Sequence, residues 1–266
     1  MPEDVRAGHP TFWQSFGTGS RAALAIHCSL ASSNAWADVM RALDDKITLA
    51  AFDMPGHGRS ADWEGTGDFL TETARIAASF VTGPVDLIGH SFGAVVALRL
   101  AEAAPEAIRT LTLIEPVLFA AARGSVEWDL YQDHNARFGQ MLAEGKRAAA
   151  AEAFTAMWGT GADWAGMDER SRNEITRRIH LVGAETAALF EDSGGILDPD
   201  RLEMLDMPVL LIRGDASPAI IETITENIAA RLPDVGVATV PGAGHMLPLT
   251  HPAEVAGLIG VNLDRG

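Results

Sequence analysis

The sequence predicts an α/β protein with a mostly parallel sheet and helices on both of its faces. Short apolar runs of strand length alternate along the chain with segments of helical spacing, and such alternation builds parallel sheets covered on both sides. One apolar run, Val85 to Ile88, passes directly into an Ala- and Leu-rich helical pattern through Gly89-His-Ser-Phe-Gly93. The alternation stops at residue 117 and resumes after residue 206, which predicts a helical insertion in one fold.

Composition and charge narrow the class of protein. The 266 residues are 47% hydrophobic and 21% charged, which is ordinary for a globular protein. The formal net charge of −16 disfavours a nucleic acid or an anionic membrane as partner and mildly favours a neutral small molecule. The first ten residues lack the apolar run of a signal peptide, and Cys28 has no second cysteine to pair with, so we expect a cytoplasmic location. Nothing in the sequence specifies an oligomeric state.

The first half of the chain supplies three strands before the strand that begins at Val85. Apolar runs predict strands over residues 11–16, 22–26 and 47–52. Residues 34–43 are expected to form a helix because Trp36, Val39, Met40 and Leu43 fall on one side of it. A second helix is predicted over residues 71–81.

The second half repeats the pattern around the insertion. Pro105 ends the helix that follows Gly93, and a strand follows over residues 110–114. Beyond the insertion we expect strands over residues 208–214 and 235–240, a helix between them over residues 218–231, and a last helix from Pro252.

Ser91 stands at the point where strand changes to helix. A chain that turns so sharply holds the middle residue in a strained, left-handed conformation, and the glycines on either side remove side chains that would collide. The hydroxyl is then presented above a helix N-terminus, whose free N–H groups favour a developing negative charge. In this context the pattern G-x-S-x-G indicates a nucleophile elbow, so Ser91 is the predicted nucleophile.

Four motifs in order make the chain resemble an α/β-hydrolase along nearly its whole length. They are His27-Cys-Ser29, Asp53-x-Pro-Gly-His-Gly-x-Ser60, Gly89-His-Ser-Phe-Gly93 and Gly242-Ala-Gly-His245. The resemblance implies a hydrolase core over residues 1–116 and 207–266 and a helical cap over residues 117–206. The cap segment is rich in Ala and carries several aromatic and Met side chains.

The resemblance also implies where the base lies. The family orders its catalytic residues as serine, acid and histidine, so the base comes late in the chain. His245 follows the last predicted strand on a loop of small residues that can approach the serine closely. We therefore predict that His245 activates Ser91.

The acid departs from the family's common pattern. The usual acid position, three residues after the glycine that closes the penultimate strand, is occupied by Ser217. Asp215 lies two residues earlier, while Glu115 ends the strand after the elbow helix, from which some haloalkane dehalogenases supply their acid. We favour Glu115 and keep Asp215 as the alternative.

An oxyanion hole needs two backbone N–H groups. The resemblance assigns them to Phe92, directly after the nucleophile, and to Ser29, in a motif where Cys28 replaces the family's glycine. Among the cap residues, Trp128 and Trp158 are expected to contact the substrate. No sequence pattern implies a cofactor or a metal.

These residues predict a serine hydrolase that cleaves a carboxylic ester through an acyl-enzyme. Lactone, thioester or carbon–carbon hydrolysis and perhydrolysis use the same groups and stay open. Dehalogenases and epoxide hydrolases of this fold attack with aspartate, so a serine disfavours those activities. A different class of function is a non-catalytic receptor for a small ligand on the same scaffold.

Overall fold

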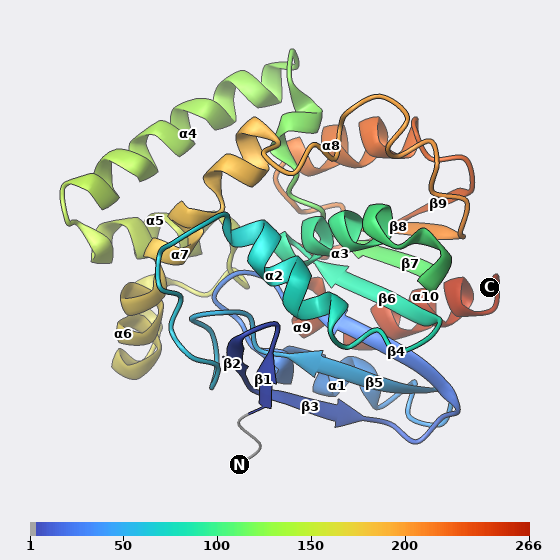
Figure 1. Ribbon diagram of the computed structural model, residues 1–266. Helices are drawn as coiled ribbons and strands as arrows, with labels where there is room; N and C mark the ends of the chain where they lie inside the picture. Colours follow the sequence, from blue (N-terminus) through green and yellow to red (C-terminus); the bar gives the residue numbers. More distant parts are fainter. Residues whose placement is uncertain (1–3) are drawn as a thin grey trace.

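The computed structural model describes residues 4–266 and is built around a seven-stranded sheet (Figure 1). Residues 1–3, the start of the predicted core, lie outside the described residues. The strand order is β3-β5-β4-β6-β7-β8-β9, in which β3 is antiparallel to β5 and the other neighbours are parallel. The predicted fold class is confirmed by this sheet. Its strands are β3 (Trp13–Phe16), β4 (Arg21–Ile26), β5 (Ile47–Phe52), β6 (Val85–His90), β7 (Ile108–Ile114), β8 (Val209–Gly214) and β9 (Val235–Val240).

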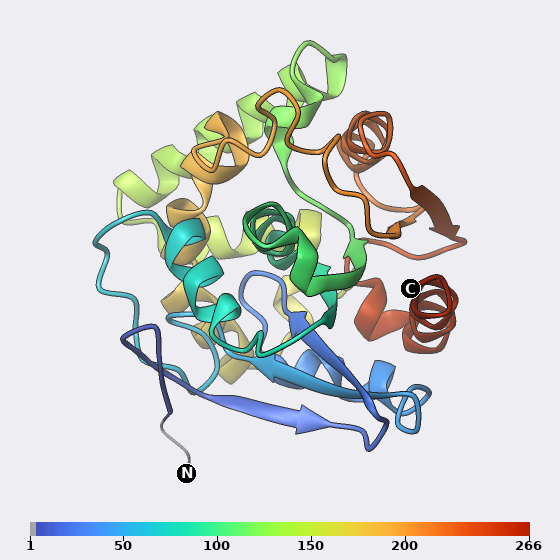
Figure 2. The same cartoon turned by 45° about the vertical axis from the view of Figure 1, so that its right-hand side comes forward.

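Helices cover the two faces of this sheet with two separate apolar layers (Figure 2). One face is covered by α2 (Phe69–Ala78), α3 (Phe92–Ala103) and α8 (Ile220–Ala229). The other is covered by α1 (Ala37–Met40), α9 (Leu247–Thr250) and α10 (Pro252–Leu263). The central strand β6 is buried at every residue, including the polar Asp86 and His90, as expected of a strand covered on both faces. Within residues 4–266, no helix combines the length and apolar character that a membrane crossing needs.

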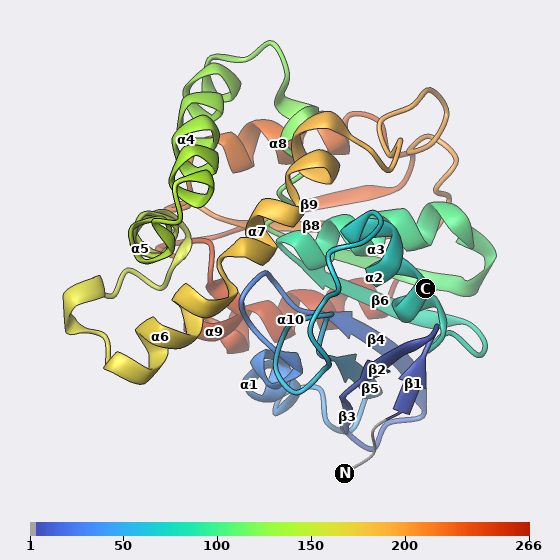
Figure 3. The ribbon, with the colours of Figure 1, turned by 60° about the vertical axis from the view of Figure 1, so that its left-hand side comes forward.

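Between β7 and β8 the chain is helical and lies to one side of the sheet (Figure 3). The longer helices are α4 (Val126–Ala143), α5 (Arg147–Trp158), α6 (Glu169–Arg178) and α7 (His180–Ala184). Shorter turns are η3 (Phe119–Ala122), η4 (Trp164–Gly166) and the π-helical η5 (Ala187–Glu191). We use the word cap for these helices and turns. The predicted boundaries at residues 117 and 206 stay a prediction.

Several predicted elements differ in extent from the structure. The helix expected over residues 34–43 is a 3-10 turn, η1 (Ser33–Trp36), followed by only four residues of α1. Helix α2 begins two residues before the predicted start because the Asp68 carboxylate accepts a hydrogen bond from the Thr71 N–H at 2.7 Å. A short hairpin, β1 (Asp4–Arg6) and β2 (His9–Thr11), precedes the sheet and was not predicted.

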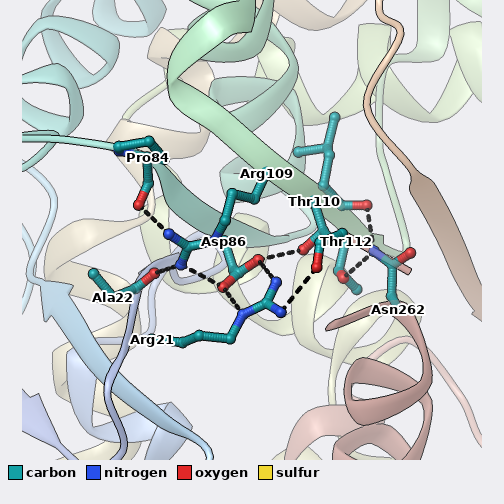
Figure 4. Close-up of polar contacts among 10 residues, drawn as sticks. Arg21, Ala22, Pro84, Asp86, Arg109, Thr110, Thr112 and Asn262 are labelled. Atoms are coloured by element: carbon teal, nitrogen blue, oxygen red, sulfur yellow. Dashed lines mark hydrogen bonds and ion pairs between the residues drawn. The ribbon is translucent and has the colours of Figure 1, made fainter. Parts of the chain in front are cut away.

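A buried carboxylate fixes the amino-terminal end of β6 (Figure 4). Asp86 is fully buried and accepts hydrogen bonds from Arg21 Nε at 2.9 Å, Arg109 Nη2 at 2.7 Å and Thr110 Oγ1 at 2.9 Å. Burial alone would raise the pKa of Asp86, but these hydrogen bonds outweigh burial and lower it. The three partners come from β4 and β7, so one side chain connects three adjacent strands.

Candidate active site

Ser91 occupies the turn between β6 and α3 in the strained conformation expected of an elbow. Its φ is 57° and its ψ is −120°, and its N–H donates to the Ile114 carbonyl at 2.9 Å. Both flanking glycines are required by close backbone approach. A Cβ on Gly89 would lie 2.4 Å from the Gly93 carbonyl oxygen, and one on Gly93 would lie 2.3 Å from the Ile26 carbonyl oxygen. The turn therefore holds the serine rigidly at the carboxyl end of β6.

A continuous chain of hydrogen bonds joins Ser91, His245 and Glu115. The Ser91 hydroxyl lies 2.9 Å from His245 Nε2, and His245 Nδ1 lies 2.9 Å from Glu115 Oε2. With Glu115 ionised, the network assigns the imidazole proton to Nδ1 and leaves Nε2 free to accept from the serine. All three side chains are buried, with 5%, 5% and 0% of each residue exposed respectively. The arrangement can move a proton from Ser91 to His245 while a carboxylate faces the resulting imidazolium.

Glu115 is fixed in place by β8. Its φ of 51° is unusual for a residue with a side chain. The Glu115 N–H donates to the Ile212 carbonyl at 2.8 Å, and Glu115 Oε1 accepts from the Gly214 N–H at 2.7 Å. The carboxylate therefore keeps one oxygen on the sheet and the other within hydrogen-bond distance of His245.

Asp215, the alternative acid, is exposed and has no hydrogen bond to His245 in residues 4–266. Its Oδ1 accepts from the Gly242 N–H at 2.6 Å, so it braces the turn that leads to His245. Ser217, in the family's usual acid position, has a buried hydroxyl without a hydrogen-bond partner among residues 4–266. The structure thus brings Glu115 to the histidine and leaves Asp215 as a turn residue.

The loop that carries His245 has two further contacts. His90 Nε2 donates to the His245 carbonyl at 2.9 Å, which holds the loop from the strand side. The Trp158 ring meets the His245 ring edge to face, with centroids 4.7 Å apart at 70°. Since burial lowers the pKa of His90 to about 3, this imidazole is neutral and has the single N–H that the contact uses.

The expected oxyanion donors lie on adjacent segments. Phe92 is the first residue of α3, where N–H groups have no acceptor within the helix. Ser29 follows β4, and the absent side chain of Gly93 lets that strand end approach the elbow. Cys28 is buried between His27 and Ser29, and burial raises the pKa of its thiol to about 12, so it is not a ready nucleophile.

A cavity of about 280 Å³ opens above Ser91, between the sheet and the cap. The cap and the segment before it contribute mostly apolar side chains, Val117, Phe119, Tyr131, Phe138, Met141, Phe154, Met157, Trp158, Leu189 and Phe190. Trp158 is thus in the position we expected. Trp128 does not line the cavity and instead packs in the core against Phe190, with ring centroids 5.7 Å apart. The distinction depends on helix packing, since both are tryptophans in helix-prone segments.

Sequence reasoning missed several polar lining residues, of which Glu185 is the most deeply buried. It directly follows α7, is 1% exposed and contacts Ser29. In the sequence it is one acid among 36 Asp and Glu residues in a helix-prone segment, and no spacing distinguishes it from a surface charge.

The fold and this site define an α/β-hydrolase. A family model described as the alpha/beta hydrolase family matches residues 23–258, and the chain belongs to that family. The resemblance seen in the four motifs is therefore confirmed.

Two individual relatives are only 25% and 26% identical to this chain over the aligned residues. The chain is 25% identical over 233 residues to a pimeloyl-[acyl-carrier protein] methyl ester esterase of Nitrosomonas europaea, covering 86% of this chain and 90% of that protein. It is 26% identical over 238 residues to a 2-(acetamidomethylene)succinate hydrolase of Mesorhizobium japonicum, covering 86% and 83% respectively. An alpha/beta hydrolase structure from Sphaerobacter thermophilus superposes with a TM-score of 0.74 and 22% identity, covering 98% of this chain and 99% of that one, which supports the fold alone.

Proposed function

We propose that the protein is a serine hydrolase that cleaves small, neutral carboxylic esters through an acyl-enzyme on Ser91. The observation that carries this proposal is the chain of hydrogen bonds from Ser91 through His245 to Glu115. An esterase name on a relative that covers most of this chain supports the choice of ester among acyl substrates.

The proposed first step forms the acyl-enzyme. Ser91 Oγ attacks the acyl carbon while its proton passes to His245 Nε2. The Glu115 carboxylate stabilises the imidazolium, and the N–H groups of Ser29 and Phe92 hold the oxyanion. The tetrahedral adduct then expels the alkoxide, which takes the proton from Nε2 and leaves as the alcohol.

Water completes the cycle. His245 Nε2 accepts a proton from a water molecule whose oxygen attacks the acyl carbon of the Ser91 ester. Collapse of the second tetrahedral adduct breaks the bond to Ser91 Oγ, which recovers its proton from His245. The net reaction is ester plus water to acid plus alcohol, and the protein returns to its starting state.

The test replaces Ser91 with alanine. We expect Ser91→Ala to lower kcat for p-nitrophenyl acetate by at least about 10³-fold with an unchanged thermal melt. Ser217→Ala is the matched control, because its hydroxyl is buried but makes no contact with the histidine, and it should retain activity. Mass spectrometry of wild type quenched during turnover should show one added acetyl group, absent in Ser91→Ala. Equal rates for wild type and Ser91→Ala would disprove the proposal.

A further inference from the structure

One polar side chain of the cap faces the reacting end of the cavity. Glu185 lines the same cavity as Ser91 and His245. Both of its carboxyl oxygens lie close to Ser29 Oγ, Oε1 at 2.8 Å and Oε2 at 2.7 Å. Because Ser29 is also the proposed oxyanion donor, the carboxyl lies one side chain away from the acyl oxygen of a bound ester.

The hydrogen-bonding capacity of Glu185 is only partly used. A carboxylic acid can donate its O–H to Ser29 Oγ while the Ser29 hydroxyl donates to the other oxygen, so this pair accounts for both short contacts and leaves only lone pairs of the carboxyl oxygens free to accept. Within residues 4–266, Ser29 is the only side chain that hydrogen-bonds to this carboxyl, and no cation pairs with it. Burial raises the pKa of Glu185 to about 8, so near neutral pH the group is an uncharged acid whose O–H can donate to Ser29 Oγ and whose remaining lone pairs can accept from a ligand.

The mostly apolar lining of the cavity limits which ligand groups can pair with the free hydrogen-bonding positions of Glu185. The lining of the cavity is mainly aromatic and aliphatic, and the other polar side chains that it contains on the cap side, His134, Asn135, Arg137 and Thr186, are less buried than Glu185. A buried polar group without a full set of partners costs free energy, which a ligand that supplies the missing partner removes. A purely alkyl acyl chain would cover the carboxyl without satisfying it.

We propose that Glu185 determines specificity by hydrogen-bonding a neutral polar substituent, such as a hydroxyl, on the carbon next to the acyl carbon of the substrate. This inference rests on the proposed ester hydrolysis. It narrows the substrate class to esters of oxygen-substituted acids.

The experiment compares two esters that differ by one hydroxyl, methyl butanoate and methyl 2-hydroxybutanoate, with acid release followed in a pH-stat at pH 7. The measured quantity is the ratio of their kcat/KM values in wild type and in Glu185→Met, a nearly isosteric apolar change. Comparing the ratios between proteins removes the intrinsic difference in reactivity between the esters. We expect kcat/KM for methyl 2-hydroxybutanoate, divided by kcat/KM for methyl butanoate, to be about tenfold lower in Glu185→Met than in wild type. This is the size expected for loss of one neutral hydrogen bond.

Two further variants separate recognition from structure. Glu185→Gln keeps a donor and an acceptor, so it should retain most of the preference. Glu152→Met is the matched control, because Glu152 is an exposed glutamate of α5 outside the cavity, and its ratio should equal that of wild type. Glu185→Leu replaces the Met variant if the latter does not fold.

Three results would overturn the inference: an unchanged ratio in the apolar variants, an equal loss for both esters, or a wild-type preference for methyl 2-aminobutanoate over the hydroxy ester. The last would indicate an ionised carboxylate that binds ammonium. Failure of the proposed function looks different, because wild type would then turn over neither methyl ester nor p-nitrophenyl acetate.

Discussion

At the scale of single residues, the first prediction concerns which carboxylate acts as the acid beside His245. Glu115 Oε1 is held by the Gly214 N–H, so a Glu115→Gln side chain keeps that contact and turns its NH2 toward His245. His245 Nδ1 would then have to accept, Nε2 would carry the proton, and Ser91 would lose its base. We expect kcat to fall about 10⁴-fold, as for the amide replacement in a serine protease.

Asp215→Asn is the control for this experiment. The amide oxygen can still accept from the Gly242 N–H, so ester hydrolysis should change only by a factor of a few. A large loss in Asp215→Asn together with a small one in Glu115→Gln would reverse the assignment of the acid.

Glu185 also predicts how stability depends on pH. Burial raises its pKa from the ordinary value of 4.5 to about 8 in the folded protein. Between these values the folded state holds more protons than the unfolded state, so this group lowers stability as the pH rises. The free energy of unfolding of Glu185→Gln minus that of wild type should grow between pH 4.5 and 8 by up to about 5 kcal/mol and then level off.

Urea unfolding of both proteins at pH 5, 7 and 9 measures this difference, and the other titrating groups cancel because both proteins share them. A difference that stays constant with pH would show that Glu185 is ionised in the folded state.

At the scale of elements, α5 places one aromatic ring beside the histidine. Trp158 lines the cavity and contacts the His245 ring, so Trp158→Phe should widen the space for the acyl chain. We expect kcat/KM for p-nitrophenyl octanoate relative to the acetate to rise about tenfold. Trp128→Phe, in the core behind the cavity, should lower the melting temperature and leave the relative rates unchanged. Equal changes in the relative rates of both variants would indicate that Trp158 of α5 contributes only to packing.

Elements of the sheet and elements of the cap differ in how well the sequence predicts them. The β6 run, the glycine-flanked elbow and the loop before His245 follow from local rules of burial and backbone conformation, and each lies close to where it was expected. In the cap, Trp128 and Trp158 are chemically identical, and only the packing of α4 and α5 decides which reaches the cavity. Glu185 could not be predicted for a similar reason, because its side chain contacts Ser29, on a loop 156 residues earlier in the chain.

At the scale of the whole molecule, the sheet is stabilised at one end and reactive at the other. Asp86 lies near the amino end of β6 and Ser91 just beyond its carboxyl end, so stability and catalysis can be changed separately. Asp86→Asn removes a buried charge from Arg21 and Arg109, which should cost about 3 kcal/mol in unfolding free energy. The kcat of the protein that remains folded should stay at the wild-type value. A parallel loss of kcat would show that β6 transmits the change to the elbow.

The buried thiol of Cys28 has a consequence for observing motion at this site. It is the only cysteine of the chain, it is 2% exposed, and its pKa of about 12 keeps it protonated. Because the thiol is buried, we expect an alkylating reagent to reach it only when the residues around it, including the adjacent Ser29, move. The rate at which iodoacetamide labels the folded protein therefore reports how often the segment that carries the proposed oxyanion donor Ser29 opens. A substrate analogue that fills the cavity should slow the labelling.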